Sequence, residues 1–256
     1  MEDLDKIYWT LQEAEGNLLG LLSNPIQDLL SDDELLQFTP MRVEKRKTEW
    51  LLGRLTAKSL VTSPNLPFAG VRFSSITIAN HPEGAPFIAK PRSHGCISIS
   101  HRQNIAVCAF TPSPDMTIGI DIEQIESREL SFVEDFFTQS EADYTKQLQE
   151  ETRHLWSTLV WSAKEAVLKA WQKGLRLDTR SIEIFPIDPE TLEHTSTQWK
   201  SIKWKANIKG FPQCWLGWQR WKNFVITLAC TTLDKESQPD PAEIIRIQLE
   251  NFPIIN

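Results

Sequence analysis

The stretch from Thr117 to Glu123 alternates apolar and polar residues, and this period of two predicts a half-buried β-strand. Its isoleucines would point to one side, and its glycine and two acids to the other. Asp121 and Glu123 would then repel each other, by ~1 kcal/mol at about 4 Å in water and by ~4 kcal/mol at an effective dielectric of about 20. A cation between them would turn this repulsion into a binding site; without one, the strand carries a solvated acidic edge.

A helix is predicted between Trp156 and Trp171, because apolar residues recur there every three or four positions. Between the two tryptophans, the apolar stripe contains Leu159, Val160, Ala163, Ala166, Val167 and Ala170. Glu165 and Lys169 lie on the opposite side, one turn apart. As a simple ion pair they would stabilise the helix by about 0.2–0.5 kcal/mol. Alternatively, three acids and one lysine suit a divalent metal ion that holds a phosphate.

Two helix starts are predicted earlier in the chain. The Ser31–Glu34 run is a capping box and predicts a helix from Asp32. Thr39-Pro40 predicts the start of a longer helix that ends near Leu60. The basic residues of that helix are Arg42, Lys45, Arg46, Lys47, Arg54 and Lys58. The last two are like charges one turn apart, which is unfavourable unless an anion lies beside them; a solvated basic face is the alternative.

A polar strand face is predicted at Ile97–His101, where the isoleucines point one way and the serines the other. His101 lies near the end of this strand. A serine hydroxyl and an imidazole N–H together can hold a phosphate, although a lone histidine is more often structural. A second apolar strand is predicted at Ile105–Phe110, and turn residues surround Gly84, where glycine allows a close backbone approach.

The stretch from Trp199 to Lys222 holds five tryptophans, six basic residues and no acid. Aromatic rings among cations could stack on single-stranded nucleic acid. However, apolar and polar residues alternate from Ile202 to Ile208, as in an antiparallel strand with one buried face. We therefore favour a sheet over a nucleic-acid platform.

The length of 256 residues suffices for one large domain or two smaller ones. Thr111–Asp115 contains two prolines and is the best candidate linker. It predicts an N-terminal half at 1–114, a C-terminal half at 115–232 and a tail at 233–256. No internal sequence repeat is strong enough to prove duplication of the halves.

Charge and cysteine content narrow the class of protein. The net charge of −7 argues against general nucleic-acid binding, and the acidic start lacks a secretory apolar core. No apolar run reaches the ~18–20 residues that a membrane span requires. The four cysteines are scattered without metal-site spacing, as in a reducing cytoplasm. We therefore expect a cytoplasmic protein without a nucleic-acid or membrane partner.

Taken together, the motifs resemble those of the 4′-phosphopantetheinyl transferases, in the larger single-chain class that activates peptide and polyketide synthetases. The matching motifs are Gly84-Ala85-Pro86, Ser98-Ile99-Ser100-His101, Ile118-Gly119-Ile120-Asp121-Ile122-Glu123, Phe136-Phe137-x-x-x-Glu141 and Trp161-Ser162-Ala163-Lys164-Glu165-Ala166-x-x-Lys169. They cover about residues 31–230. G-x-D-x-E alone is weak; its combination with S-x-S-H before it and W-S-x-K-E-x-x-x-K after it is specific.

The resemblance implies an α/β (α+β) fold of two similar halves related by a pseudo-twofold axis. Each half would be a small sheet packed with a long helix, and coenzyme A would bind between them. The implied reaction is the Mg²⁺-dependent transfer of the phosphopantetheine arm of coenzyme A to a serine of an apo acyl or peptidyl carrier protein. Adenosine 3′,5′-bisphosphate is released. With both halves on one chain, we expect a monomer.

The resemblance also implies roles for single residues. Asp121, Glu123 and Glu165 would hold Mg²⁺, Glu165 would be the base for the carrier serine, and Lys169 would stabilise phosphoryl oxygens or the leaving group. The coenzyme A contacts would include Gly84, Ala85, Pro86, Ser100, His101, Arg102, Asp121 and Lys169. Many relatives carry Lys or Arg at the position of Ala85, and the stretch around Glu34 and Gln37 is not basic. We expect Arg46, Arg54 or Lys58 to replace the missing phosphate contacts.

Two alternatives remain open from the sequence. A metal-dependent nuclease or phosphohydrolase could also use D-x-E with E-x-x-x-K, although the net charge and the S-x-S-H strand count against it. A non-catalytic nucleic-acid-binding module could rest on the Trp199–Lys222 stretch, and salt-dependent binding to DNA or RNA would favour it.

Overall fold

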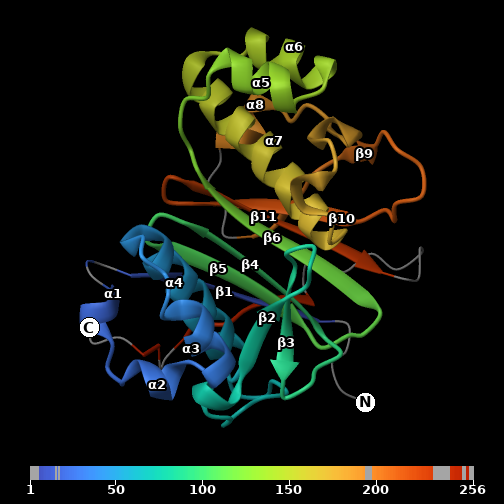
Figure 1. Cartoon of the computed structure of the whole chain (residues 1–256). Helices are drawn as coiled ribbons and strands as arrows, with labels where there is room; N and C mark the ends of the chain where they lie inside the picture. Colours follow the sequence, from blue (N-terminus) through green and yellow to red (C-terminus); the bar gives the residue numbers. More distant parts are fainter. Residues whose placement is uncertain are drawn as a thin grey trace. The chain divides into compact units, whose positions relative to one another are not determined.

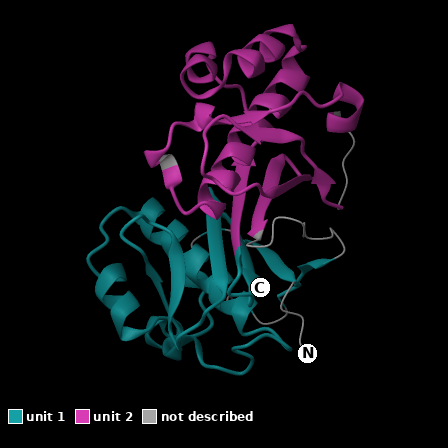
Figure 2. Ribbon diagram, turned by 90° about the vertical axis from the view of Figure 1, so that its right-hand side faces the viewer, with its two compact units in different colours: residues 1–116, 242–256 teal, residues 117–241 magenta. Residues whose placement is uncertain are grey.

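The computed structural model describes residues 6–14, 16, 18–193, 198–232, 243–249 and 252–253. The chain forms two compact units: unit 1 is residues 1–116 with 242–256, and unit 2 is residues 117–241 (Figure 2). Each unit packs a four-stranded sheet against one long helix. The predicted α/β class with two sheet-and-helix halves is confirmed. Residues 233–242 of the predicted tail lie outside the described residues.

Unit 1 is organised around helix α4, which contacts strands β5, β4 and β1 (Figure 1). Its elements are β1 (Ile7–Glu13), α1 (Leu18–Leu21), α2 (Ile26–Leu29), α3 (Asp32–Phe38), α4 (Glu44–Val61), η1 (Phe73–Ser75), β2 (Thr77–Asn80), β3 (Pro86–Lys90), β4 (Cys96–Arg102), β5 (Ile105–Thr111) and β12 (Ile244–Arg246). The sheet has the order β12-β1-β5-β4, and β2 pairs with β3 in a separate hairpin. Strand β12 pairs in parallel with β1, so a segment near residue 244 extends a sheet that begins at residue 7.

The predicted capping box of α3 is confirmed, but the predicted start of the next helix at Thr39-Pro40 is wrong. The Thr39 hydroxyl donates to the Leu35 carbonyl at 2.8 Å instead of accepting from a following N–H. Its backbone N–H also bonds Leu35 O, so Thr39 ends α3. Helix α4 begins later, at Glu44, after Val43 in extended conformation.

Unit 2 is organised around helix α7, which contacts strands β11 and β10 (Figure 1). Its elements are β6 (Met116–Gln124), α5 (Leu130–Phe136), α6 (Gln139–Gln147), α7 (Glu150–Ala170), η2 (Gly174–Arg176), η3 (Thr179–Ser181), β7 (Ile182–Ile184), α8 (Pro189–Glu193), β8 (Lys200–Ser201), β9 (Trp204–Ala206), β10 (Trp215–Trp221) and β11 (Phe224–Thr232). The sheet order is β6-β11-β10-β8. The helix predicted from Trp156 to Trp171 is confirmed and begins earlier, at Glu150.

The antiparallel strand predicted from Ile202 to Ile208 is confirmed only in part: its alternation of buried and exposed residues is present, but the strand itself is the shorter β9, and the chain changes sheet just before it. Strand β8 pairs with β10, and strand β9 pairs with β7. Between them, the Ile202 N–H still donates to Leu216 O at 2.8 Å, whereas the Lys203 carbonyl accepts from the Phe185 N–H at 2.9 Å. The stretch from Ile202 to Ile208 therefore makes backbone bonds to two different sheets.

Strand β6 is buried on both faces from Ile118 to Ile122, not on one face as predicted. Helix α7 covers the Gly119 side so closely that an added Cβ would lie 2.0 Å from Ala166 O and 2.5 Å from Ala170 N. Only a residue without a side chain allows this contact. The glycine of the G-x-D-x-E motif therefore sets the distance between the strand and the helix.

We expect Gly119→Ala to lower the free energy of unfolding by about 1–3 kcal/mol, because the clash is with backbone atoms that cannot rotate away. Urea denaturation measures the effect. Gly53→Ala in α4 is the control: its Cβ would meet only side-chain atoms, the Ile99 Cγ2 atom at 3.2 Å and the His101 Cδ2 atom at 4.0 Å. There the gain of about 1 kcal/mol in helix propensity offsets the crowding. Equal losses in both variants would contradict this account.

Unit 1 contains a fully buried ion pair between Glu34 and Lys58, whose side chains are both 0% exposed. Glu34 Oε2 accepts from the Ser31 N–H, and Glu34 Oε1 accepts from the Ile78 N–H at 3.1 Å. Beside the carboxylate, Lys58 Nζ donates to two carbonyls at 2.8 Å, those of Leu29 and Phe73. Burial lowers the pKa of the Lys58 ammonium, and Glu34 opposes this effect.

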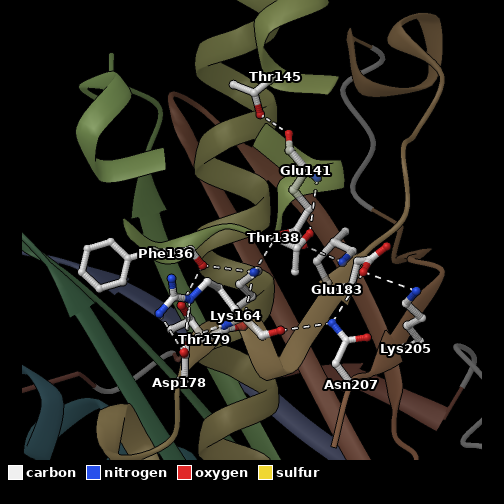
Figure 3. A network of polar contacts seen from close by, with 12 residues as sticks. Phe136, Thr138, Glu141, Thr145, Lys164, Asp178, Thr179, Glu183, Lys205 and Asn207 are labelled. Atoms are coloured by element: carbon white, nitrogen blue, oxygen red, sulfur yellow. Dashed lines mark hydrogen bonds and ion pairs between the residues drawn. The ribbon is translucent and has the colours of Figure 1, made fainter. Parts of the chain in front are cut away.

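Unit 2 repeats this arrangement around Glu141 and Lys164, which are also 0% exposed (Figure 3). Lys164 Nζ lies 2.7 Å from Glu141 Oε2 and donates to the carbonyls of Phe136 and Thr179 at 3.2 Å. Glu141 Oε1 accepts from the Ile184 N–H at 2.6 Å. The spacing along the chain is the same in both units. The first carbonyl that accepts from the lysine belongs to the residue five positions before the glutamate. The second belongs to the residue five positions before the one whose N–H bonds the glutamate Oε1. The two units therefore share a local plan that no sequence repeat had revealed.

Candidate active site

Asp121 lies on β6, facing α7, and is 4% exposed. Its Oδ1 accepts from Lys169 Nζ at 2.7 Å, and its Oδ2 accepts from the Ser162 hydroxyl at 2.8 Å. Lys169 also donates to the Ile120 carbonyl at 3.2 Å. The structure therefore brings together Asp121 and Lys169, which the sequence analysis assigned to one site.

Glu123 contacts the start of the same helical motif. Its Oε1 accepts from the Trp161 indole N–H at 2.9 Å, and its Oε2 lies 3.5 Å from Arg128 Nη2. The spacing W-S-x-K-E-x-x-x-K now has a physical reason: Trp161, Glu165 and Lys169 are four residues apart and lie along one face of α7. Two of them bond to the two acids of β6.

Glu165 lies close enough to these acids to be influenced by their charge. Burial raises the pKa of the Glu165 carboxyl to about 7; Lys169 opposes the rise, and Asp121 and Glu123 add to it. The charges of two carboxylates on β6 therefore act on a third carboxylate on α7. We call Asp121, Glu123 and Glu165 the acidic centre of unit 2.

The donor set fits Mg²⁺, which prefers carboxylate oxygens and retains some water. Burial is the main cause of the raised pKa of Glu165, and a divalent cation would offset the smaller repulsion that Asp121 and Glu123 add to it. In the described part of the chain, no three His, Cys, Asp or Glu side chains are already grouped as a metal site. The positive charges beside Asp121 and Glu123 here are those of Lys169 and Arg128.

Sequence reasoning missed two positioning groups in unit 2. Ser162 was only part of a motif, yet it is fully buried and bonds Asp121. The Thr227 hydroxyl on β11 lies 2.8 Å from Ser162 Oγ and donates to the Ser162 carbonyl. The signal for Ser162 was its place in the motif, one residue after Trp161; Thr227, far along the chain, gave none.

In unit 1, the predicted polar strand is confirmed as β4, which carries Ser100, His101 and Arg102. Ser100 is buried, whereas the His101 side chain is 41% exposed. The Nδ1 atom of His101 lies 4.0 Å from a carboxylate oxygen of Glu49 on α4. Arg46, on the same helix, is exposed. That these side chains contact phosphate remains a prediction.

Arg54, which is 7% exposed, supports the Gly84–Pro86 turn through Asn80. Arg54 Nη2 donates to Asn80 Oδ1 at 2.6 Å, and Asn80 Nδ2 donates to the Gly84 carbonyl at 2.6 Å. Gly84 has φ +98, a conformation that favours glycine. The prediction that Lys58 contacts a phosphate is wrong, because all three of its donors are used in the buried pair with Glu34.

The strands of the Trp199–Lys222 stretch belong to two sheets, β8 and β10 to one and β9 to the other. Trp215 and Trp218 on β10 are 6% and 1% exposed, so their rings are in the core and cannot stack on nucleic acid. Trp204 donates its indole N–H to the Cys214 carbonyl at 2.9 Å. The sheet interpretation is confirmed for β10, and nothing in this stretch supports the nucleic-acid alternative.

The described helices offer no membrane span: none is both long and apolar enough to cross a bilayer.

Comparison with known proteins points to one family. A family model described as the 4′-phosphopantetheinyl transferase superfamily matches residues 117–229, which include the acidic strand and α7. The 4′-phosphopantetheinyl transferase HetI of Nostoc sp. is 27% identical over 186 residues, covering 70% of this chain and 76% of HetI. The 4′-phosphopantetheinyl transferase Sfp of Bacillus subtilis is 31% identical over 138 residues, covering 52% of this chain and 56% of Sfp.

A more distant animal protein matches as well. The L-aminoadipate-semialdehyde dehydrogenase-phosphopantetheinyl transferase of Xenopus laevis is 26% identical over 155 residues, covering 56% of this chain and 49% of that protein. The family match and the acidic centre of unit 2 fall on the same residues. Residues 117–229 therefore belong to the 4′-phosphopantetheinyl transferase superfamily, and the chain is similar to the transferases HetI and Sfp.

Proposed function

We propose that the protein transfers the 4′-phosphopantetheine arm of coenzyme A to a serine of an apo carrier protein of a peptide or polyketide synthetase. Adenosine 3′,5′-bisphosphate is the second product. The observation that carries this proposal is the contact between β6 and α7, where Lys169 bonds Asp121 beside Glu123 and Glu165. These residues lie within the region that matches the family.

Asp121, Glu123 and Glu165 would hold Mg²⁺ through their carboxylate oxygens. When bound, the ion would supply positive charge to the diphosphate of coenzyme A. Glu165, directly or through a bound water, would accept the proton of the carrier serine. Lys169 would stabilise negative charge that develops on the phosphoryl oxygens.

In unit 1, we propose that Ser100, His101, Arg102 and Arg46 contact the phosphates of coenzyme A. The Gly84–Pro86 turn, including Ala85, would contact the nucleotide through its backbone. Arg54 supports this turn through Asn80 instead of reaching a phosphate. We also propose that the enzyme is a monomer that acts in the cytoplasm; its four cysteines are free thiols, as expected in a reducing compartment.

The decisive test is to mix the protein with an apo carrier protein, coenzyme A and Mg²⁺, and to measure the mass of the carrier. We expect a gain of one phosphopantetheine group on one serine. Several carriers, from fatty-acid, polyketide and peptide synthetases, should be compared. Unmodified carriers throughout, together with cleavage of a phosphodiester substrate, would contradict the proposal and favour a phosphohydrolase.

Lys169→Ala is expected to lower kcat by about 10²–10³-fold, because it removes a positive charge aimed at the transition state. Steady-state kinetics with coenzyme A and carrier would measure the loss. Lys173→Ala is the control, because Lys173 is exposed just after the same helix. Wild-type kinetics for Lys169→Ala would remove this residue from the site.

A further inference from the structure

Lys164 comes directly before Glu165 in α7, but its side chain points into the fold of unit 2 and is completely buried (Figure 3). An ammonium has three N–H donors, and Lys164 has one acceptor for each. The acceptors come from three separate segments: Glu141 on α6, the Phe136 carbonyl that ends α5, and the Thr179 carbonyl that begins η3. The side chain is therefore held from three directions.

Fixing Lys164 fixes the rotation of α7 about its own axis. Consecutive residues of a helix point about 100° apart, so the direction of Lys164 determines that of Glu165. The same rotation places Ser162 and Lys169 on the two oxygens of Asp121. Gly119 brings β6 so close to α7 that a small roll of the helix would move these groups relative to the strand.

We propose that Lys164 is a positioning residue: its buried pair with Glu141 sets the rotation of α7 and thereby the place of Glu165 and Lys169 against Asp121. This inference rests on the proposed function of that site. Stability alone does not account for the pair, because buried ion pairs can often be replaced by apolar residues of similar volume without loss. What an apolar pair cannot supply is a set of three directed hydrogen bonds.

Unit 1 offers a matched control for this inference. Glu34 and Lys58 make the same set of bonds, to a capping-box N–H, a strand N–H and two carbonyls. They anchor α4, which carries no residue of the acidic centre. Changing this pair disturbs a buried ion pair of the same construction and leaves the Asp121 site untouched.

The test compares Glu141→Gln/Lys164→Met with Glu34→Gln/Lys58→Met. The readouts are urea unfolding, Mn²⁺ affinity by electron paramagnetic resonance in place of Mg²⁺, and kcat and KM for coenzyme A. For the unit 2 variant we expect metal affinity to fall by about 10–100-fold, as when partners behind metal ligands are removed. We also expect kcat to fall by about 10²-fold, as for a misplacement near 1 Å, with KM for coenzyme A little changed. The unit 1 variant should retain wild-type metal affinity and kcat.

Wild-type metal affinity and kcat in the unit 2 variant would overturn the inference. So would equal losses in both variants, because that result would indicate a purely structural role. If the double variant does not fold, Lys164→Arg keeps the charge but changes the donor directions, and wild-type values there would also overturn the inference. Failure of the wild-type protein to modify any carrier would reject the proposed function. The Mn²⁺ affinities of the two variants would still test whether Lys164 positions the carboxylates.

Discussion

Asp121→Asn is expected to lower phosphopantetheine transfer by about 10²–10³-fold while the protein stays folded. The amide removes the negative charge that Lys169 contacts at 2.7 Å and that Mg²⁺ would bind. Its oxygen can still accept the Ser162 hydroxyl, which bonds Asp121 Oδ2 in the structure. The measurement is the rate of mass gain of the carrier at saturating coenzyme A and Mg²⁺.

The fold of this variant is checked by urea denaturation and circular dichroism. Asp115→Asn is the matched control: the same chemical change is made at an exposed residue one position before β6. It should leave the transfer rate unchanged. If Asp121→Asn transferred at the wild-type rate, Asp121 would play no part in catalysis, and the acidic centre of unit 2 would need another explanation.

Lys58→Met is expected to lower the free energy of unfolding by about 3–5 kcal/mol, because it leaves the Glu34 carboxylate buried without its partner. Both side chains are 0% exposed, so water cannot replace the lost ammonium. The carbonyls of Leu29 and Phe73 also lose their shared donor. The midpoint of a urea transition, at unchanged slope, measures the loss.

The double variant Glu34→Gln/Lys58→Met tests the reason for this loss. If the cost comes from an uncompensated charge, removing the charge should restore most of the stability. Lys90→Met serves as the surface control: Lys90 contacts Asp33 at 2.7 Å, but its side chain is 67% exposed, so its loss should change stability by less than about 1 kcal/mol. A loss of the same size at Lys90 would contradict the burial argument.

The elements that the sequence predicted well are those with strong local signals. The isoleucines of β6 and the apolar stripe of α7 repeat with the periods of a strand and a helix, and the Ser31–Glu34 capping box marked the start of α3. The start of α4 was wrong because Thr39 can either end one helix or begin the next. Its hydroxyl decides this through a bond to the preceding turn.

The buried lysines could not be predicted, because their partners are distant in the sequence. Lys58 pairs with a glutamate 24 residues away, and Lys164 bonds a carbonyl 28 residues away. Read locally, Lys58 belongs to a basic helix face, and it was wrongly expected to contact a phosphate. The acidic centre was predictable because its residues lie in two dense motifs, whereas the hydroxyl of Thr227 is 65 residues from Ser162.

The parallel pairing of β12 with β1 has a practical consequence for handling the protein. A shortened chain that stops after β11 would lose Ile244–Arg246 and uncover the edge of β1 from Ile7 to Trp9. The exposed N–H and C=O groups of that edge would form a ready template for strands of other molecules. Such a fragment would tend to self-associate even though it keeps every residue of the acidic centre, so a purification tag should not replace the last strand.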